Sequence, residues 1–399
     1  MRIFLTIVCI FLLLIILLYV DLIVGKALNK RKVTRRNYPF RQSDFHIFND
    51  GKDLFPDFFR ELEKAEKHIH ILFYTVKADT ISNQFLSILE QKSQEGVEVR
   101  LLLDWLGSFQ IRKKIRNKLK EAGVQFSYCN TPKMPLFYSL QVRNHRKITI
   151  IDGKIGYVGG FNIGKDYIHG NLKLSPWRDY HLKMSGEGVE DLQREFLLDW
   201  STATKTNLLQ NSVYFPEQPE GSSRHQFIPT QGVYLEDVLC GLIRNTRKTL
   251  FIGTPYFIPS KRIMEELSMA QDRNVAITLL LPTKPDHPLV KEASFRYLRT
   301  LLKRGAKAYH YKHGFFHGKI ITADDEICFI GTPNFDKRSI FLNHELVCCV
   351  FDSNFITKMN RIVREDLSLS EEYTLQFLLK PKAKTVVLEY IARIFAPLL

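Results

Sequence analysis

The sequence has few cysteines, and they lack the spacings that bind zinc or form a redox pair. Only six cysteines occur in 399 residues, and no two form a C-x-x-C pair. Acidic residues are also scarce: 42 stand against 57 lysines and arginines, for a formal net charge of +15. The first shortage argues against zinc-ribbon and thiol-redox proteins and predicts buried, reduced thiols in a reducing, cytosolic compartment. The second predicts an anionic partner: nucleic acid, an anionic membrane or a phosphorylated substrate.

The sequence also lacks clusters of histidines and carboxylates at metal-ligand spacing, and it contains no recognisable nucleic-acid-binding module. These absences predict a protein that needs no metal or cofactor and does not bind nucleic acid. Hydrophobic residues, in contrast, make up 45% of the chain, which is ample for packed cores. A length of 399 residues suits two domains of ordinary size.

The N-terminus is a nearly continuous apolar run over residues 3–20, which is long enough to cross a hydrocarbon core. The alternative is a cleaved signal peptide, but its apolar region should be shorter and should end in a small-x-small site. We therefore predict a retained, single-pass anchor at residues 1–25. Basic residues are abundant in the juxtamembrane linker at 26–43, whereas only Arg2 precedes the run. The positive-inside rule then places the rest of the chain on the cytoplasmic side of the cell membrane, with the linker against anionic headgroups.

A motif with the skeleton H-x-K-x4-D, followed at a fixed distance by asparagine, occurs twice in the chain. Every interval between its members is the same in both copies, and the two histidines are 172 residues apart (317 − 145). Two complete copies make coincidence negligible and suggest that one site is assembled from both. The first copy is His145, Lys147, Asp152 and Asn162, and the second is His317, Lys319, Asp324 and Asn334.

The elements around the two motifs repeat in the same order, which predicts an internal duplication. The fold class is α/β, with two tandem domains, each a mixed β-sheet flanked by helices. We expect the domains at 44–206 and 227–399, joined by a linker at 207–226 that is rich in proline, glycine and serine. In the first half, the repeated elements are a strand at 69–74, a helix at 80–94, a strand at 97–103 and a helix at 111–120. Their counterparts in the second half are at 250–257, 263–273, 275–281 and 289–304.

Two further segments are predicted to be helical. Residues 111–120 combine an apolar stripe with six basic residues, which suits either a membrane-surface helix or an ordinary core helix with a solvated face. Residues 370–399 predict two helices around Pro381, and this segment has no counterpart in the first half.

The residues of the paired motif suit chemistry at a phosphodiester. Two lysines would supply positive charge, and two asparagines would donate hydrogen bonds to the phosphate oxygens, so that charge is stabilised in the transition state. One histidine can attack phosphorus, while the other protonates the leaving oxygen and later deprotonates the incoming hydroxyl. The alternation of side chains along a strand puts His145 and Lys147 on one face, so both can point into a shared pocket.

The paired motif resembles that of the phospholipase D superfamily, from about Asp44 to the C-terminus. Further stretches resemble bacterial cardiolipin synthases in particular, and the N-terminal apolar run agrees with this. These stretches are WRDYHL at 177–182, TPYFIP at 254–259, NFDKRS at 334–339 and the terminal APLL at 396–399.

This resemblance implies transfer of a phosphatidyl group between two phosphatidylglycerol molecules through a phosphatidyl-histidine, with release of glycerol. It implies that His145 is the nucleophile and His317 the acid/base. By position, Asp179 would orient His145 and Glu345 would orient His317. The candidate catalytic set also includes Lys147, Lys319, Asp152 and Asp324, and the phosphate-binding set is Lys147, Asn162, Lys319 and Asn334. We expect Asp152 and Asp324 to hold the motif's own loops by hydrogen bonds rather than to touch substrate.

The sequence departs from the family pattern in two ways. Gly160 and Thr332 stand where the family often has serine, and the N-terminus has room for one span where many relatives have two. Two apolar stretches beside the motifs, at 134–138 and at Phe315-Phe316, suit either lipid acyl chains or plain core packing.

Other functions use the same residues. A hydrolase of the phospholipase D type would use water as the acceptor, and another phosphatidyltransferase would use a different headgroup. A membrane-anchored nuclease would suit the positive charge. A non-catalytic protein that binds anionic membranes is the alternative of another class, although it would not need two complete motifs.

Overall fold

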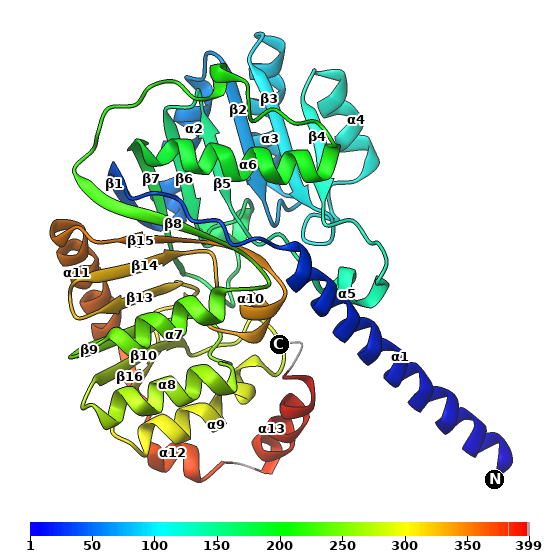
Figure 1. Ribbon diagram of the computed structural model, residues 1–399, viewed down its shortest axis with the longest axis vertical. Coiled ribbons are helices and arrows are strands. Elements are labelled where there is room, and N and C mark those ends of the chain that lie inside the picture. The colour runs from blue at the N-terminus through cyan, green and yellow to red at the C-terminus, as the bar shows by residue number, and fades with distance from the viewer. Residues whose placement is uncertain (382, 397–399) are drawn as a thin grey trace.

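In the first half of the chain, the strands predicted at 69–74 and 97–103 and the helices predicted at 80–94 and 111–120 form with boundaries that differ by only a few residues, whereas β4 and α5 were not predicted. A computed structural model describes residues 1–381 and 383–396 (Figure 1). The elements of this half are α1 (Arg2–Lys32), β1 (Arg41–Asp50), α2 (Gly51–Glu63), β2 (His68–Phe73), α3 (Thr80–Gln94), β3 (Glu98–Asp104), α4 (Lys113–Glu121), β4 (Gln125–Cys129), α5 (Leu136–Gln141), β5 (Ile148–Ile151), β6 (Ile155–Gly159), a 3-10 turn (Lys165–Ile168), β7 (Trp177–Gly186) and α6 (Gly188–Thr204).

The second half repeats this order and then adds a C-terminal extension. Its elements are β8 (Ser223–Gln231), α7 (Leu235–Asn245), β9 (Thr249–Gly253), α8 (Lys261–Asp272), β10 (Ala276–Pro282), α9 (Val290–Leu302), β11 (Lys307–Tyr311), β12 (Phe315–Phe316), β13 (Ile320–Ala323), β14 (Ile327–Gly331), α10 (Lys337–Phe341), β15 (His344–Val350) and α11 (Ser353–Ser368). The extension is β16 (Ser370–Glu372), α12 (Leu375–Leu379) and α13 (Ala383–Phe395). The terminal motif residues Pro397, Leu398 and Leu399 lie outside the described residues.

The two halves share one continuous sheet, whose strand order is β16-β11-β10-β9-β13-β14-β15-β8-β1-β7-β6-β5-β2-β3-β4, with β12 paired to β7. Outward from the antiparallel β1–β8 pair, the order β8-β15-β14-β13-β9-β10-β11 repeats β1-β7-β6-β5-β2-β3-β4. This confirms the α/β fold built from a duplicated unit. Figure 1 shows the first half above and the second below, meeting at this pair.

Strand β8 is the main element that the sequence did not predict. It begins at Ser223, inside the interval 207–226 assigned to the linker, and it pairs with both β1 and β15. Its sequence contains Pro229 and several polar residues, which weaken a strand pattern. Its position between two partners in the sheet, rather than its own composition, makes it a strand. The division of the chain into separate domains stays a prediction.

A hydrophobic core that includes residues from both halves joins them. Phe196 of α6 and Met359 of α11 belong to this one core, and both side chains are fully buried. Helix α4 packs Leu119 and the preceding Ile111 into the first half's core, so residues 111–120 form an ordinary core helix with a solvated basic face, not a membrane-surface helix. Five of the six cysteines are buried free thiols; Cys9 is exposed on α1.

Helix α1 projects from the body (Figure 1), and it is the one described helix that is long and apolar enough to cross a membrane. Its outer residues are exposed, whereas its inner end packs on α5. The Asp21 carboxylate accepts the backbone N–H of Tyr138 at 2.7 Å, and the absence of a side chain at Gly25 allows the Tyr138 ring to approach. The helix is thus attached to the segment that leads into the first motif.

Candidate functional site

Each motif histidine is held by backbone pairing with the other half of the chain. The N–H of His145 donates to the carbonyl of His344 at 2.9 Å, and the N–H of His344 donates to the carbonyl of Arg143 at 2.8 Å. On the other side, the N–H of His317 donates to the carbonyl of Arg178 at 2.6 Å, next to the parallel pairing of β12 with β7. The duplication therefore places each histidine beside the strand of the opposite half.

This exchange decides which carboxylate orients which histidine, and the predicted assignment is wrong. Nδ1 of His145 lies 3.0 Å from Oε2 of Glu345, and Nδ1 of His317 lies 2.6 Å from Oδ2 of Asp179. Each acid lies against a motif histidine, but the pairs are crossed. The reason is that Asp179 follows Arg178, whose carbonyl binds the backbone of His317, and Glu345 follows His344, whose carbonyl binds the backbone of His145.

All four groups of these two pairs are buried, which governs their protonation. Burial lowers the pKa of His145, and Glu345 offsets this only in part. Burial and the neighbouring Lys319 lower the pKa of His317 to about 4. Burial alone would raise the pKa of Glu345, but its contacts with His145 and Lys147 outweigh this and lower it to about 2. The carboxylates are therefore ionised at neutral pH, and the imidazoles of the free protein are neutral.

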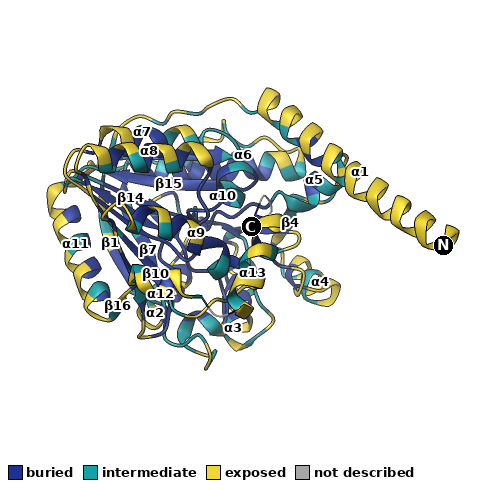
Figure 2. Ribbon diagram, turned by 90° about the horizontal axis from the view of Figure 1, so that it is seen from below, coloured by how far each residue is buried: buried dark blue, intermediate teal, exposed yellow. Residues whose placement is uncertain are grey.

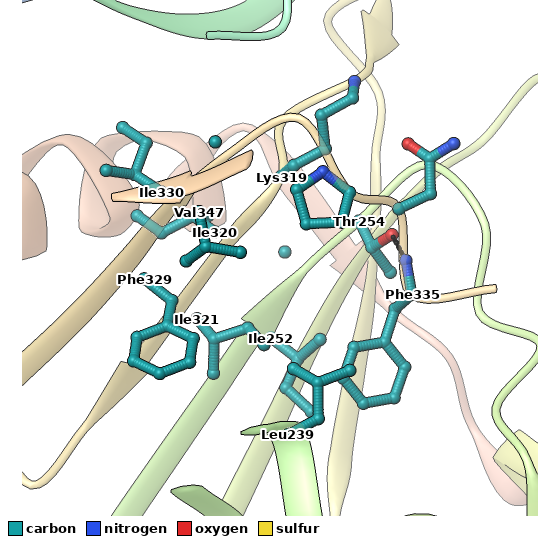
Figure 3. Close-up of a pocket in the computed structure, with 14 residues that line it drawn as sticks. Leu239, Ile252, Thr254, Lys319, Ile320, Ile321, Phe329, Ile330, Phe335 and Val347 are labelled. Atoms are coloured by element: carbon teal, nitrogen blue, oxygen red, sulfur yellow. Dashed lines mark hydrogen bonds between the residues drawn. The ribbon is translucent and has the colours of Figure 1, made fainter. Parts of the chain in front are cut away.

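The two lysines are fully or almost fully buried, and each donates to the backbone carbonyl of its own motif histidine, but Lys319 has additional contacts. Nζ of Lys147 donates to the carbonyl of His145 at 2.6 Å, and burial lowers its pKa to about 7. Nζ of Lys319 lies 3.2 Å from Asp179 and 2.5 Å from Nδ1 of His317, and burial lowers its pKa as well. Figure 3 shows Lys319 pointing away from a group of apolar side chains. These side chains surround a void of about 30 Å³ and support the aliphatic stem of the lysine.

The asparagines complete the set. Both line a cavity of about 680 Å³ together with His145 and His317. The side chain of Asn162 accepts the N–H of Thr75 at 3.1 Å and donates to the hydroxyl of Tyr167 at 3.2 Å. Among the described residues, Oδ1 of Asn334 has no hydrogen-bond partner although it is buried. A buried polar atom of this kind is expected to gain a partner from a ligand or water.

The motif aspartates lie at the far ends of their strands and do not line this cavity. The carboxylate of Asp152 accepts the N–H groups of Glu66, Lys67 and His68 at 2.7–2.9 Å. Asp324 accepts those of Arg247, Lys248 and Thr249 at 2.7–2.9 Å. Both carboxylates therefore hold loops by hydrogen bonds, which is the contact that we expected of them. We assign neither of them a contact with substrate.

The lining of the cavity also includes residues that sequence reasoning missed. Tyr74 follows β2 and packs against His145 with ring centres 5.1 Å apart, and Tyr256 follows β9 near His317 with centres 6.3 Å apart. Their positions after equivalent parallel strands could have identified them, because ligands bind where such strands end. Other lining residues that had no predicted site role include Lys77, Arg143, Asp166 and Asp286, together with Trp177, Asp336 and Arg338 from the stretches that carry the family resemblance.

The two apolar stretches beside the motifs have different environments. Phe315 and Phe316 are fully buried, and Phe315 packs on Trp177, so these residues are core and not a lipid path. Met134 and Leu136 are exposed at the start of α5, beside the inner end of α1. Only this second stretch retains the apolar surface that a lipid could contact.

Among residues 1–381 and 383–396, no group of three or more histidines, cysteines and carboxylates is arranged to hold a metal ion. The site has two imidazoles and two amides in the lining of one cavity, and each imidazole is paired with a carboxylate. Lys147 and Lys319 contact the motif histidines but are not themselves part of this lining. Such a set can bind a phosphodiester anion and transfer protons at its oxygens.

Comparison with known proteins agrees with this chemistry. The family model described as "Cardiolipin synthase, PLD-like domain" matches residues 58–196 and 239–367. The minor cardiolipin synthase ClsB of Bacillus subtilis (strain 168) is 37% identical over 394 residues, covering 98% of each chain. The major cardiolipin synthase ClsA of the same organism is 36% identical over 360 residues, covering 88% of this chain and 75% of that protein.

Solved structures support the fold. Phosphatidylserine synthase of Haemophilus influenzae Rd KW20 superposes with a TM-score of 0.71 at 14% identity, covering 94% of this chain and 100% of that one. Polyphosphate kinase of Porphyromonas gingivalis gives a TM-score of 0.55 at 15% identity, covering 88% and 53%. With two matched regions around a site built from both, this chain belongs to the cardiolipin synthase family of phospholipase D-like phosphatidyltransferases.

Proposed function

We propose that this protein makes cardiolipin from two molecules of phosphatidylglycerol through a phosphatidyl-histidine. The observation that carries the proposal is the pair of imidazoles in one cavity, each oriented by a buried carboxylate from the opposite half. The relatives named cardiolipin synthase support the choice of substrate.

In the first step, the donor phosphodiester would lie between the two imidazoles. Because Nδ1–H of His145 is directed at Glu345, Nε2 carries the lone pair that attacks phosphorus. A P–N bond forms, the bond from phosphorus to the glycerol oxygen breaks, and His317 gives that oxygen its proton. Glycerol leaves.

In the second step, the hydroxyl of another phosphatidylglycerol attacks the same phosphorus. His317 takes the hydroxyl proton, the new P–O bond forms and the P–N bond to His145 breaks. Atoms and charge balance over the two steps, and His317 ends protonated, as it began.

His317 must be protonated before the first step, although burial and Lys319 lower its pKa in the free protein. An incoming phosphodiester anion would raise that pKa, because it adds negative charge beside the ring. It would also attract Lys319 away from Nδ1 of His317, where the ammonium lies at 2.5 Å. Substrate binding would thus prepare the acid, while Lys147 and Asn162 hold phosphate oxygens on the other side.

The acceptor distinguishes this function from its alternatives. Purified protein should be incubated with vesicles containing phosphatidylglycerol alone, and the products separated. We expect cardiolipin and glycerol in equal amounts. Phosphatidic acid as the main product would indicate a hydrolase, and no turnover would contradict the proposal.

The intermediate can be tested with two variants. We expect His145→Ala and His317→Ala each to lose activity by about 10⁴-fold or more. With donor labelled in the phosphatidyl group, His317→Ala should retain label on His145, because glycerol is released slowly and the next step is blocked. His313→Ala, which removes an exposed histidine, is the control. Label on His317 in the His145→Ala variant would reverse the assigned roles.

We also propose that α1 anchors the protein in the cell membrane with the catalytic body on the cytoplasmic side. The support is the apolar length of α1 and the basic residues at its inner end. A reporter at the C-terminus should be active inside the cell, and activity only outside would contradict this topology.

A further inference from the structure

Helix α13, in the C-terminal extension, exposes an unusually apolar face to solvent. Tyr390 is 68% exposed, whereas Ala392 on the packed side is fully buried against the body. A monomeric surface rarely leaves so many large apolar side chains together without a partner. The exposed apolar residues of the helix are Val386, Val387, Tyr390, Ile394 and Phe395.

This face lies on the side of the body toward which α1 projects. In Figure 1, α1 descends from the middle of the molecule, and α13 lies at the lower edge of the body on that same side. Figure 2, seen from below, shows α13 on the surface turned to the viewer, with much of its ribbon coloured as exposed. A layer crossed by α1 would therefore meet α13 without any rearrangement of the fold.

Basic side chains stand on α1, α10, α9 and α13. Nζ of Lys26 lies 5.7 Å from the ring centre of Phe341 in α10, the short helix that begins with Lys337. Burial and the positive charge of Arg296 on α9 both lower the pKa of Lys337. We call Lys26, Lys337, Arg296 and Arg393 the basic band.

The basic band ends at a cleft between α9 and α13. The cleft has a volume of about 300 Å³, and its lining includes Arg296 and Arg393. Arg299, also in the lining, is already paired with Glu389 at 2.5 Å. Cations beside an exposed apolar helix are the composition of a helix that lies in a membrane interface, where anionic headgroups neutralise the charge.

We infer that α13 is a second membrane attachment, which lies in the interface of an anionic bilayer while the basic band binds its headgroup phosphates. The inference rests on the proposed membrane anchor α1, because α1 sets the direction in which the bilayer lies. It does not depend on the catalytic steps.

A second attachment would fix the tilt of the body. Helix α1 is joined to α5 through Asp21 and Gly25, so the body must follow any tilt of α1 in the bilayer. Contact at α13 adds a distant second point and removes this freedom. The cavity would then keep a constant height above the lipid headgroups, which suits a substrate that resides in the membrane.

The test uses spin labels on the full-length protein in vesicles. A Cys9→Ser background removes the exposed thiol, and the other five cysteines are buried. One label is placed by Tyr390→Cys on α13. Phe11→Cys on α1 gives the reference inside the bilayer, and Thr357→Cys on α11, which is exposed and distant from α1, gives the aqueous reference. Accessibility to oxygen and to a water-soluble nickel complex is then compared.

In vesicles with phosphatidylglycerol, the label at 390 should show several-fold higher oxygen-to-nickel accessibility than the label at 357, with a value below that at 11. In pure phosphatidylcholine the difference should shrink, because the basic band loses its anionic partners. Equal values at 390 and 357 in anionic vesicles would overturn the inference. Dipolar broadening at 390 would show a second copy of the chain on this face and would overturn it too.

An activity measurement separates this inference from the proposed reaction. The variant Val387→Glu/Ile394→Glu should lose about tenfold in rate on phosphatidylglycerol vesicles, yet should act normally on a short-chain phosphatidylglycerol dispersed as monomers. Val386→Ala is the mild control. Equal loss on both substrates would indicate damage to the fold, and loss on neither would contradict a role for α13 at the membrane.

Discussion

On the Glu345 side of the site, side chains surround the carboxylate, whereas on the Asp179 side backbone and a lysine do so. Glu345 accepts hydrogen bonds from Thr332 and Ser339 at 2.6 and 2.8 Å and from Asn343 at 3.3 Å. Asp179 accepts the N–H of Tyr180 at 2.8 Å and the ammonium of Lys319 at 3.2 Å.

The residue equivalent to Thr332 explains this difference. In the first half it is Gly160, and a Cβ there would lie 2.0 Å from Oδ1 of Asp179. The shorter acid therefore occupies space that a hydroxyl takes up on the other side. The comparison teaches that a duplicated motif can give two imidazoles with different surroundings, which a reaction with one nucleophile and one acid requires.

The largest expected effect comes from removing either carboxylate charge. We expect Glu345→Gln and Asp179→Asn each to lower kcat by about 10²–10³-fold, because the partner imidazole loses its orientation and its stabilised cation. With ¹⁵N-labelled histidine, Glu345→Gln should move the ring signals of His145 and spare those of His317, and Asp179→Asn should do the reverse. The opposite pattern would contradict the crossed pairs.

The next largest effect is expected in the pH dependence of anion binding, which distinguishes Lys147 from Lys319. Because burial lowers the pKa of Lys147 to about 7, its ammonium is lost as the pH rises through 7. Binding of a phosphate analogue such as tungstate should then weaken by about tenfold per pH unit above 7. Lys147→Arg should remove this alkaline limb, because a guanidinium stays charged. Lys154→Arg, at an exposed turn, should leave the profile unchanged; an unchanged profile in Lys147→Arg would assign the limb to another group.

A smaller effect on kcat is expected when the hydroxyl of Thr332 is removed or a side chain is added at Gly160. Thr332→Val should lower kcat by about tenfold, since a hydrogen bond to a charged group contributes about 1.5–3 kcal/mol. Gly160→Ala should cost more than Thr332→Val, because the added Cβ must displace Asp179 and with it His317. If Gly160→Ala were the milder of the two, Asp179 would have room that its contacts do not indicate.

The smallest effect on activity is expected at the motif aspartates. Asp152→Ala and Asp324→Ala each remove a carboxylate that accepts three backbone N–H groups, and we expect a loss of about 2 kcal/mol in the free energy of unfolding. The kcat of the folded variants should stay within about twofold of the parent. Denaturant unfolding and initial rates would measure the two quantities, and a large fall in kcat without a change in stability would return these residues to the catalytic set.

Much of the site could be predicted from the sequence, because it depends on local spacing. The spacing of the motif identified the histidines, lysines and asparagines, and hairpin geometry explains why each aspartate reaches a neighbouring loop. The pairing of acids with histidines could not be predicted this way. It depends on Asn144 forming a bridge with His344, 200 residues away in the chain, and sequence distance favoured the wrong partner.

The sequence by itself determined the duplicated α/β unit, the motif residues and the apolar N-terminal helix, because periodicity and fixed intervals are local properties. The tertiary structure alone decided three other matters. It made β8 a strand of the central sheet, it gave each imidazole the carboxylate of the opposite half, and it buried Phe315 and Phe316. The physical reason is common to all three. When two copies of a unit pack against each other, residues of one copy contact residues of the other. The residue spacing within either copy does not predict which residues form these contacts.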